Sequence, residues 1–349
     1  MATIFDTTNL TLKPKEVQDL SAAIVEKSFI TPAIEKLHRI QQGVQMKEQI
    51  LMIGQMGLTG IAQSGCGRDS SGATVPMSEK FWEPANFGDR LINCVPEMNA
   101  LWKAYFGKIK SYEDLYNMQG SELGKLLLVL LEEAIAKAVL RITWFGDKNI
   151  AASEAAASGL ITADNVKFFD VIDGLWKQIY TGVTASSIIK ADLQITADAS
   201  LQSVYDAADE RLRSDPTAVF MVTRSVFDKY KAELRAASKS FELETTTEGL
   251  RSIKWDGIEV INMENIWNSN MKMFEADSTD HGAFLPDRIV FSTPDALPIG
   301  TLNQSDLTTL KSWYDMKDEV NYTDYGFTID AKIVDEKMIS VAYGTMPTA

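Results

Sequence analysis

The stretch from Ser121 to Asp147, SELGKLLLVLLEEAIAKAVLRITWFGD, constrains the fold more than any other part of the sequence. It predicts one helix of about 25 residues, which is about twice the usual helix length in a globular protein. Ser121 suits the N-cap position and Gly146 suits the C-terminal cap. One apolar stripe recurs at helical spacing: Leu127, Leu131, Ala134, Ile135, Ala138 and Ile142.

Charged residues occupy the opposite half of this helix: Lys125, Glu132, Glu133, Lys137 and Arg141. Further apolar residues lie among those charges, so we expect the helix to be covered on more than one side: Leu126, Val129, Leu130 and Leu140. The longest apolar run, Leu126 to Leu131, has six residues. A membrane span needs about 18. The helix is therefore predicted to form part of a protein core, not to cross a membrane.

Length and charge limit the function classes. A chain of 349 residues predicts two domains or one elongated one. The net charge of −14 disfavours a protein whose main task is to grip phosphates, although an inner surface that tolerates packed nucleic acid stays open. Two cysteines, Cys66 and Cys94, suit a reducing compartment, and the N-terminal sequence MATIFDTTNL lacks the features of a secretion signal.

The first third of the chain predicts a helical segment followed by a long hairpin. Residues 13 to 42 have helical periodicity that Pro32 interrupts, and a second short helix is predicted to carry Ile34, Leu37 and Ile40. Residues 46 to 84 contain repeated glycines and the polar sequence GCGRDSSG, which predicts a long hairpin or extended loop. A glycine-rich phosphate cradle is disfavoured there, because no G-K-[ST] occurs.

Beyond an Ala- and Ser-rich boundary at residues 151 to 159, strands and helices alternate, which predicts an α/β layer. The predicted helices are 164–180, with Thr162 or Asp164 as the cap, 200–213 and 225–237. The first of these is expected to bury Phe168, Val171, Ile172, Leu175 and Ile179. Buried strands are predicted at 218–222, 257–262 and 288–292, and closing antiparallel strands at 327–333 and 338–343.

No residue pattern indicates catalysis, a cofactor site or a metal site. His38 and His281 are far apart in sequence, and a surface or hydrogen-bonding role is expected for each. Cys94 is expected to be a buried inert thiol, and Cys66 an exposed one without a neighbouring base. The acidic group Glu275, Asp277 and Asp280 lacks the order of a calcium loop. The pair Glu132 and Glu133 is expected to be solvated or ion-paired with Lys137.

The order of these parts resembles the major capsid protein of tailed bacteriophages, whose α+β fold is called Hong Kong 97-like. Three groups of short sequence motifs carry the resemblance: Trp82-Glu83-Pro84, Gly88-Asp89-Arg90 and Cys94 before the long helix; Arg141 and Trp144-Phe145-Gly146-Asp147 at its end; and Gly174-Leu175-Trp176-Lys177-Gln178-Ile179 beyond it. They are similar to a subfamily found in phages of Bacteroides-type hosts, over essentially the whole chain.

This resemblance implies four regions. An N-terminal arm would comprise residues 1–45 and an extended loop 46–84, while a peripheral domain with the long spine helix would comprise 85–160 and 312–349, and an axial domain 161–311. It also implies hexamers and pentamers of the chain itself in an icosahedral shell around double-stranded DNA, bound without sequence specificity. The shell would assemble in the bacterial cytoplasm and form the virion capsid. Scaffold, portal and decoration proteins are the expected further partners, with no membrane and no cofactor.

Three alternatives remain open from the sequence. An encapsulin-like compartment shell would share the fold but enclose an enzyme. An α+β enzyme of unknown chemistry would require a pocket with convergent polar groups. Another virion structural protein, such as a tail or head-decoration component, would form small rings or trimers. Deleting residues 54–78 is expected to leave a soluble chain that forms no closed shells.

Overall fold

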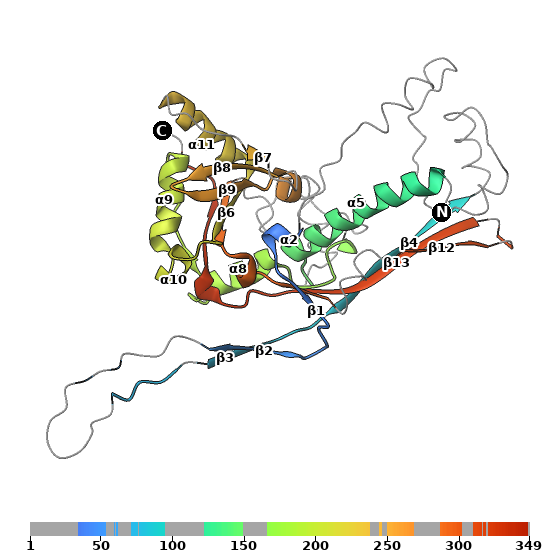
Figure 1. Cartoon of the computed structure of the whole chain (residues 1–349), viewed down its shortest axis with the longest axis horizontal. Helices are drawn as coiled ribbons and strands as arrows, with labels where there is room; N and C mark the ends of the chain where they lie inside the picture. Colours follow the sequence, from blue (N-terminus) through green and yellow to red (C-terminus); the bar gives the residue numbers. More distant parts are fainter. Residues whose placement is uncertain are drawn as a thin grey trace.

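The structure is a computed structural model that describes residues 34–53, 59, 61, 71–75, 77–94, 122–148, 166–237, 244–245, 250–268, 287–301, 310–315, 317–318 and 320–347. A compact head lies at one end and a long extension leads away from it (Figure 1). A two-stranded hairpin projects from the region where head and extension meet (Figure 1). Among the described residues, no helix is both long and apolar enough to cross a bilayer.

The head is built on a seven-stranded mixed sheet with the order β5-β14-β10-β6-β9-β8-β7. The strands are β5 (Ile189–Lys190), β6 (Val219–Val222), β7 (Glu244–Thr245), β8 (Arg251–Trp255), β9 (Ile258–Asn262), β10 (Asp287–Ser292) and β14 (Ile339–Gly344). The predicted strands at 218–222, 257–262, 288–292 and 338–343 are therefore confirmed. β6 and β9 are parallel, and the helix between them makes the crossover that an α/β layer requires.

The central strands of the head sheet are buried on both faces. Phe220 and Val222 of β6 belong to one apolar cluster, while Met221 between them belongs to the other. The first cluster packs under α9 (Ala197–Ala207) and α11 (Arg224–Ala236), and the second under α8 (Leu175–Thr184) and the end of α5 (Glu122–Phe145). This continuous burial explains why the strands are short apolar runs without alternation.

Two of the predicted helices have different boundaries. The helix predicted over 164–180 is wrong over residues 167–174, because Asp147 N–H donates to Phe169 O and Gly174 N–H donates to Gly146 O. These bonds use the backbone of residues 166–174 to cover the end of α5. The helix predicted over 200–213 is two helices, α9 and α10 (Glu210–Arg213), and the Asp209 side chain caps the second at Arg211 N–H. The third, 225–237, is confirmed as α11.

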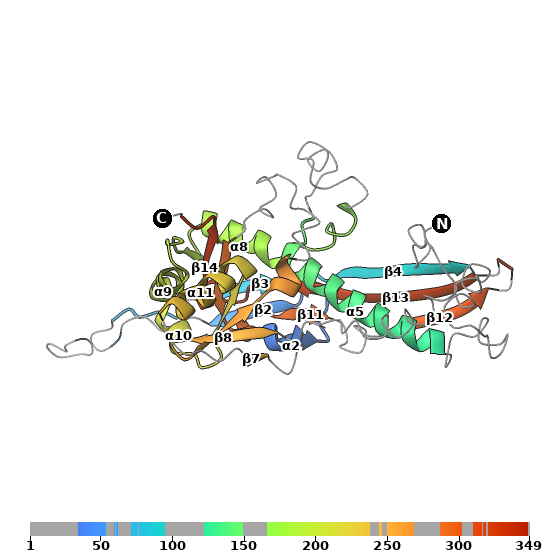
Figure 2. The same cartoon turned by 90° about the horizontal axis from the view of Figure 1, so that it is seen from above.

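The extension consists of α5 lying along a sheet in which β13 is central (Figure 2). β13 (Val320–Ala331) pairs antiparallel with β4 (Ala85–Cys94) over ten register positions and with β12 (Leu310–Asp315) over six. Its end also pairs with β11 (Ile299–Thr301), which in turn pairs with β1 (Ile40–Gln42). The predicted strand at 327–333 is thus the second half of β13 as far as Ala331.

The long helix is confirmed as α5, with 24 residues. Ile135, Ala138 and Ile142 are buried as expected, and Leu140 is buried too, so the helix is covered on more than one side. Ala134 is exposed, and Arg141 is only half exposed although it was expected on the charged side. The Arg141 guanidinium lies 5.4 Å and 5.5 Å from the ring centres of Phe168 and Phe169, which cover it.

Gly146 follows the last residue of α5, but its φ lies outside the left-handed region, so it is not the glycine cap that was expected. Two glycines instead allow two backbones to touch. A Cβ on Gly146 would lie 2.5 Å from Ile172 O, and a Cβ on Gly174 would lie 2.6 Å from Gly146 N. The end of the spine helix and the start of α8 therefore meet backbone to backbone.

The hairpin predicted within residues 46–84 is confirmed at its base, where β2 (Gln49–Ile53) pairs antiparallel with β3 (Met77–Phe81). The second short helix is confirmed as α2 (Ile34–Leu37), although Ile40 lies in β1. The reason is that Arg39 N–H bonds Pro294 O and Ile299 N–H bonds Arg39 O, so the backbone is held in a strand.

The remaining elements are η1 (Glu264–Asn268), η2 (Pro294–Ala296) and η4 (Glu336–Met338). β14 falls in the range 312–349, which the capsid resemblance assigns to the peripheral domain, yet it pairs with β10 and β5 in the head sheet. The predicted boundary at 151–159 and the helix predicted over 13–31 lie outside the described residues.

Candidate assembly surfaces

The hairpin exposes apolar side chains instead of burying them. Eight large apolar side chains are exposed among the described residues, and four of these lie between residues 46 and 84: Met46, Ile61, Val75 and Phe81. A two-stranded ribbon is marginally stable at best in water. The apolar side chains of the hairpin therefore become buried only when the hairpin packs against another surface.

The base of the hairpin is held by Trp82, which is fully buried directly after β3. Trp82 N–H donates to Glu48 O, and Lys47 N–H donates to Trp82 O, so both sides of the base are tied together. The indole ring lies over Gly300 of β11, where a Cβ would be only 2.8 Å from the ring. The glycine is needed here because it lets the ring lie flat on the strand.

Two polar side chains, Asp330 and Lys80, add hydrogen bonds at this base. Glu83 N–H donates to Asp330 Oδ2 at 2.7 Å, and Ala331 N–H donates to the other carboxylate oxygen at 2.9 Å. Burial raises the pKa of Asp330 above its ordinary value. Lys80 of β3 donates to Ile333 O at 2.7 Å and to the Glu336 carboxylate at 2.8 Å. The base of the hairpin is thus fixed to the body on both sides of Trp82.

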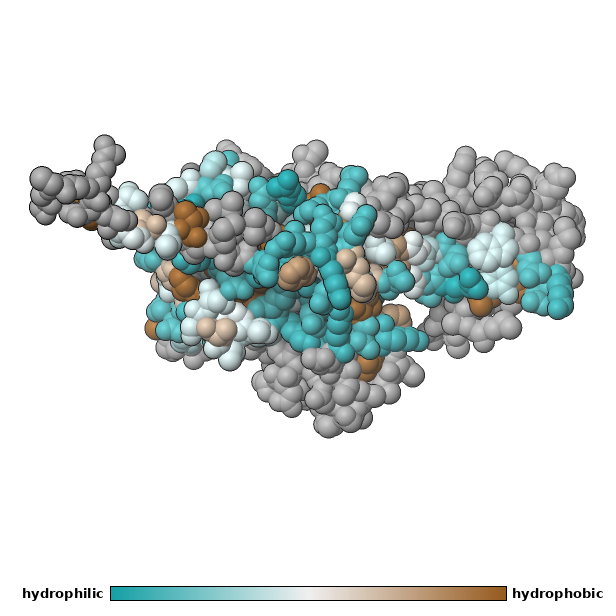
Figure 3. Space-filling model, turned by 90° about the horizontal axis from the view of Figure 1, so that it is seen from below, coloured by the Kyte–Doolittle hydropathy of each residue, from teal (hydrophilic) through white to brown (hydrophobic). Residues whose placement is uncertain are grey.

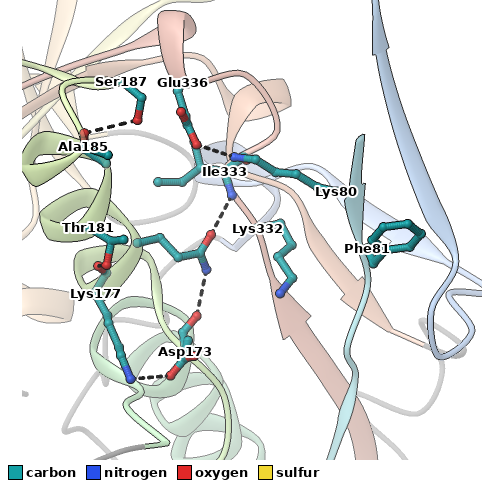
Figure 4. A pocket seen from close by; sticks show the side chains of 12 residues that line it. Lys80, Phe81, Asp173, Lys177, Thr181, Ala185, Ser187, Lys332, Ile333 and Glu336 are labelled. Atoms are coloured by element: carbon teal, nitrogen blue, oxygen red, sulfur yellow. Dashed lines mark hydrogen bonds and ion pairs between the residues drawn. The ribbon is translucent and has the colours of Figure 1, made fainter. Parts of the chain in front are cut away.

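A pocket of about 400 Å³ opens beside this base, between β3, α8 and the turn after β13 (Figure 4). Its polar groups are engaged with one another: Lys177 donates to Asp173, and Gln178 donates to Ala331 O and accepts from Ile333 N–H. These hydrogen bonds connect α8 to the end of β13 and to the turn that follows it. The pocket lining offers neither a histidine nor a cysteine for chemistry.

A buried histidine joins three segments under the spine helix. The Trp144 indole N–H donates to His38 Nε2 at 3.1 Å, so this nitrogen is unprotonated. His38 Nδ1–H therefore donates to Leu297 O at 2.9 Å. Burial lowers the pKa of His38 from 6.5 to about 4. The hydrogen-bonding role expected for His38 is confirmed, and the ring connects α2, α5 and η2.

Trp144 also belongs to an aromatic cluster below the head sheet. Its ring centre lies 5.0 Å from that of Trp267 and 6.1 Å from that of Trp176. The guanidinium of Arg288 lies 4.4 Å from the Trp176 ring centre, and burial lowers the pKa of Arg288. These four side chains are buried and form part of the packed core.

The sheet of the extension has a second face, turned away from α5. Trp313 of β12 stacks on Tyr322 of β13 at 5.5 Å, and Trp313 is 41% exposed. Arg90 of β4 lies 5.5 Å from the Trp313 ring centre and donates to Asp324 at 2.9 Å. Figure 3 views the molecule from below, the side on which this sheet is not covered by the helix.

Several residues that the sequence offered as candidates for a thiol, histidine or metal site lie outside the described residues. Cys66, His281 and the acidic group Glu275, Asp277 and Asp280 lie outside the described residues. Cys94 ends β4, opposite Val320, and its side chain and those of Glu132 and Glu133 are outside the description. Within the described part of the chain, no group of three or more His, Cys, Asp or Glu side chains could hold a metal ion.

Sequence reasoning missed the residues that anchor the hairpin. Lys80, Asp330 and Glu336 are ordinary surface residue types in sequence, and 247 residues separate Glu83 from its partner Asp330. Alternation along β13 would have predicted that Asp330 lies on the face opposite Ile329. It would not have identified Glu83 as the residue that binds it. Trp82 stood out only as part of the Trp82-Glu83-Pro84 motif of the capsid resemblance.

Solved structures with a similar fold include chains from phage particles. A chain of the satellite phage P4 procapsid with its size determination protein has a TM-score of 0.52 and 11% identity, covering 94% of this chain and 99% of that one. A chain of Gordonia phage Cozz has a TM-score of 0.54 and 10% identity, covering 93% and 89%. A chain of the cyanophage A-1(L) capsid has 0.51 and 12%, covering 92% and 95%. No protein-family model and no curated protein matches the sequence.

The fold is therefore the one that these phage chains share: a head, a long extension with its spine helix, and a projecting hairpin. It is the Hong Kong 97-like fold of phage major capsid proteins, as the resemblance in the sequence predicted.

Proposed function

We propose that this chain is a major capsid protein, which assembles with copies of itself into the icosahedral head shell that encloses phage double-stranded DNA. Its role is structural, not enzymatic. The observation that carries this proposal is the projecting hairpin, which is anchored at its base by Trp82 and exposes the apolar side chains of Met46, Ile61, Val75 and Phe81. A chain that is built in this way needs neighbours to cover it.

The similar solved chains support the same conclusion, because two of them come from a procapsid and from a capsid asymmetric unit. The likeness extends over more than nine tenths of this chain in each case. It therefore includes the head, the extension and the hairpin, and not one common motif. A net charge of −14 fits a shell whose inner wall does not trap DNA.

The proposed regions follow from this function. Residues 1–45 form the N-terminal arm and 46–84 the extended loop, while 85–160 with 312–349 form the peripheral domain and 161–311 the axial domain. The strand pairing of β14 supports adding residues 339–344 to the axial domain. Hexamers and pentamers are the proposed building units. Scaffold, portal and decoration proteins are the proposed partners, and assembly takes place in the host bacterial cytoplasm before the protein resides in the virion.

Expression of the full chain alone in bacteria tests this proposal. Sedimentation and negative-stain imaging should show closed shells, or rings of five or six copies. A chain that stays monomeric alone and with co-expressed neighbouring phage genes would overturn the proposal. Nucleic acid inside particles purified from phage supports a viral head, whereas an enclosed enzyme would identify a compartment shell.

A shortened hairpin tests the loop assignment. Ile53 and Met77 are register partners, so residues 54–76 can be replaced by a two-residue Asn-Gly turn that keeps the base intact. We expect a folded chain, with the tryptophan fluorescence of the full-length chain, that forms no closed shells. Because the base stays anchored, a loss of shells cannot be attributed to a disturbed body. Normal shells from this variant would show that the loop is not an assembly element.

A further inference from the structure

Arg141, near the end of α5, is a half-buried cation that has no carboxylate partner among the described residues. The Nε atom of its guanidinium is buried, and within the described part of the chain it has no hydrogen-bond partner. Burial lowers the pKa of Arg141, and the Tyr325 phenol is the group that opposes this shift. A charge that is withdrawn from water without a partner destabilises the folded chain. Stability of the fold therefore does not account for an arginine at this position.

Arg211 shows the arrangement that a partly buried cation ordinarily has. Its side chain is 35% exposed, and it forms ion pairs with Asp209 at 3.2 Å and with Asp335 at 3.3 Å. The whole chain has 48 acidic and 34 basic residues, so carboxylates are in excess. The fold nevertheless directs none of the described carboxylates to Arg141, and the charge stays available to a partner from outside the chain.

Two phenylalanine rings hold the Arg141 guanidinium in place. Its central carbon lies 5.4 Å from the ring centre of Phe168 and 5.5 Å from that of Phe169. The segment that carries these rings is fixed to the end of α5, because Asp147 N–H donates to Phe169 O at 2.9 Å. The guanidinium is therefore held in position before a ligand arrives, which reduces the ordering that binding requires.

Lys167 adds a second positive charge at the same place. Its Nζ lies 5.2 Å from the Phe168 ring centre, and both Lys167 and Phe168 are exposed. A guanidinium binds two oxygens of a phosphate or carboxylate at once, and an ammonium on a flexible stem adds a further donor. A phosphate suits two cations better than a carboxylate does, because its charge near pH 7 is about −1.5 to −2. The chemistry of the site therefore favours a phosphate group.

We propose that Arg141 and Lys167 form a phosphate-binding site, in which the Arg141 guanidinium binds two phosphate oxygens and Lys167 binds a third from the exposed side of Phe168. The phosphate is either a free anion or part of a DNA backbone. In a chain with a net charge of −14, a site of two cations holds one phosphate without gripping DNA along its length. The inference does not depend on the proposed shell function, because the site belongs to the unassembled chain.

Inorganic phosphate tests the site in the full unassembled chain. We expect about 10 mM phosphate to raise the unfolding temperature of the wild type by about 2 °C relative to sodium chloride of equal ionic strength. Arg141→Met should abolish this shift, and Lys167→Met, a change at an exposed residue, should reduce it by about half. Arg213→Met is the matched control, because Arg213 is an exposed arginine that lies 5.9 Å from the Tyr205 ring centre on the head. It should keep the full shift.

Chemical modification gives a second measurement that needs no variant to fold. Phenylglyoxal reacts with arginine side chains, and peptide mass spectrometry reports the extent of reaction at each site. We expect phosphate to slow the modification of Arg141 at least about fivefold in the wild type and to leave that of Arg213 unchanged. The absence of protection at Arg141 would overturn the proposal. Equal temperature shifts in the wild type, Arg141→Met and Lys167→Met would overturn it as well, and so would an equal loss of the shift in Arg213→Met.

A short DNA duplex distinguishes the two sources of the phosphate. If the ligand is a backbone phosphate, the duplex should bind the wild type, and Arg141→Met should weaken binding about fivefold and reduce the salt slope by about one. Binding of inorganic phosphate without binding of the duplex would identify a free phosphate as the ligand. Binding of neither would overturn the proposal, and it would leave the proposed shell function untouched, because that function is tested by particle formation.

Discussion

His38 makes the stability of the fold depend on pH in a predictable direction. The ring is neutral in the folded protein, because Trp144 donates to Nε2 and the burial of the ring lowers its pKa from 6.5 to about 4. In the unfolded chain the same group takes up a proton near pH 6.5. The contribution of neutral His38 is therefore complete above pH 6.5 and is lost as the pH falls from 6.5 toward 4.

The magnitude follows from the two pKa values. Between pH 7 and pH 5, the free energy of unfolding should fall by about 2 kcal/mol from this group alone, and the full shift corresponds to about 3 kcal/mol. Urea unfolding of the unassembled chain at several pH values, followed by tryptophan fluorescence, measures this change. Asp330 acts in the opposite direction, because a raised carboxyl pKa contributes stability that is lost as the pH rises through it.

The matched variant is His38→Gln. Its amide can accept from the Trp144 indole and donate to Leu297 O, but it does not titrate. The difference between the wild type and His38→Gln therefore isolates the ring from every other titrating group. We expect the variant to lose about 2 kcal/mol less between pH 7 and pH 5. The same pH dependence in both proteins would refute the reasoning about His38.

Two further changes test the packing. Gly174→Ala places a Cβ 2.6 Å from Gly146 N, so the end of α5 and the start of α8 must separate. Urea unfolding should show that the free energy of unfolding falls by about 3 kcal/mol. A fall of less than about 1 kcal/mol would contradict this close approach. Lys80→Met removes the bonds to Ile333 O and Glu336 at the base of the hairpin, and it should cost about 1 kcal/mol. Hydrogen exchange in β2 and β3 should become faster in Lys80→Met but not in Lys317→Met, a change at an exposed lysine of the β12–β13 turn.

Local signals in the sequence predicted the elements that depend on their own residues. The apolar stripe of residues 121–147 predicted α5, and short apolar runs predicted β6, β9 and β10, because burial on both faces requires apolar residues at successive positions. The start of α8 was missed because residues 166–174 have helical periodicity. Their backbone groups are used by Gly146 and Asp147 instead. Periodicity alone cannot show that a distant segment takes those hydrogen bonds.

The candidate assembly surfaces were likewise predicted only in part from the sequence. The glycine-rich composition of residues 46–84 was enough to predict the hairpin, but not its anchoring by Trp82, Lys80 and Asp330. Those contacts join β3 and the residues after it to the end of β13, about 250 positions later in the chain.

The sequence by itself therefore determined that the chain has a long core helix, a glycine-rich hairpin and an α/β head, because propensity and hydrophobic period are properties of neighbouring residues. Only the tertiary structure decided which ends meet: Trp82 on Gly300, His38 under Trp144, and Gly146 against Gly174. The physical reason is that close backbone approach and buried hydrogen bonds depend on partners that the folded chain brings together from far apart.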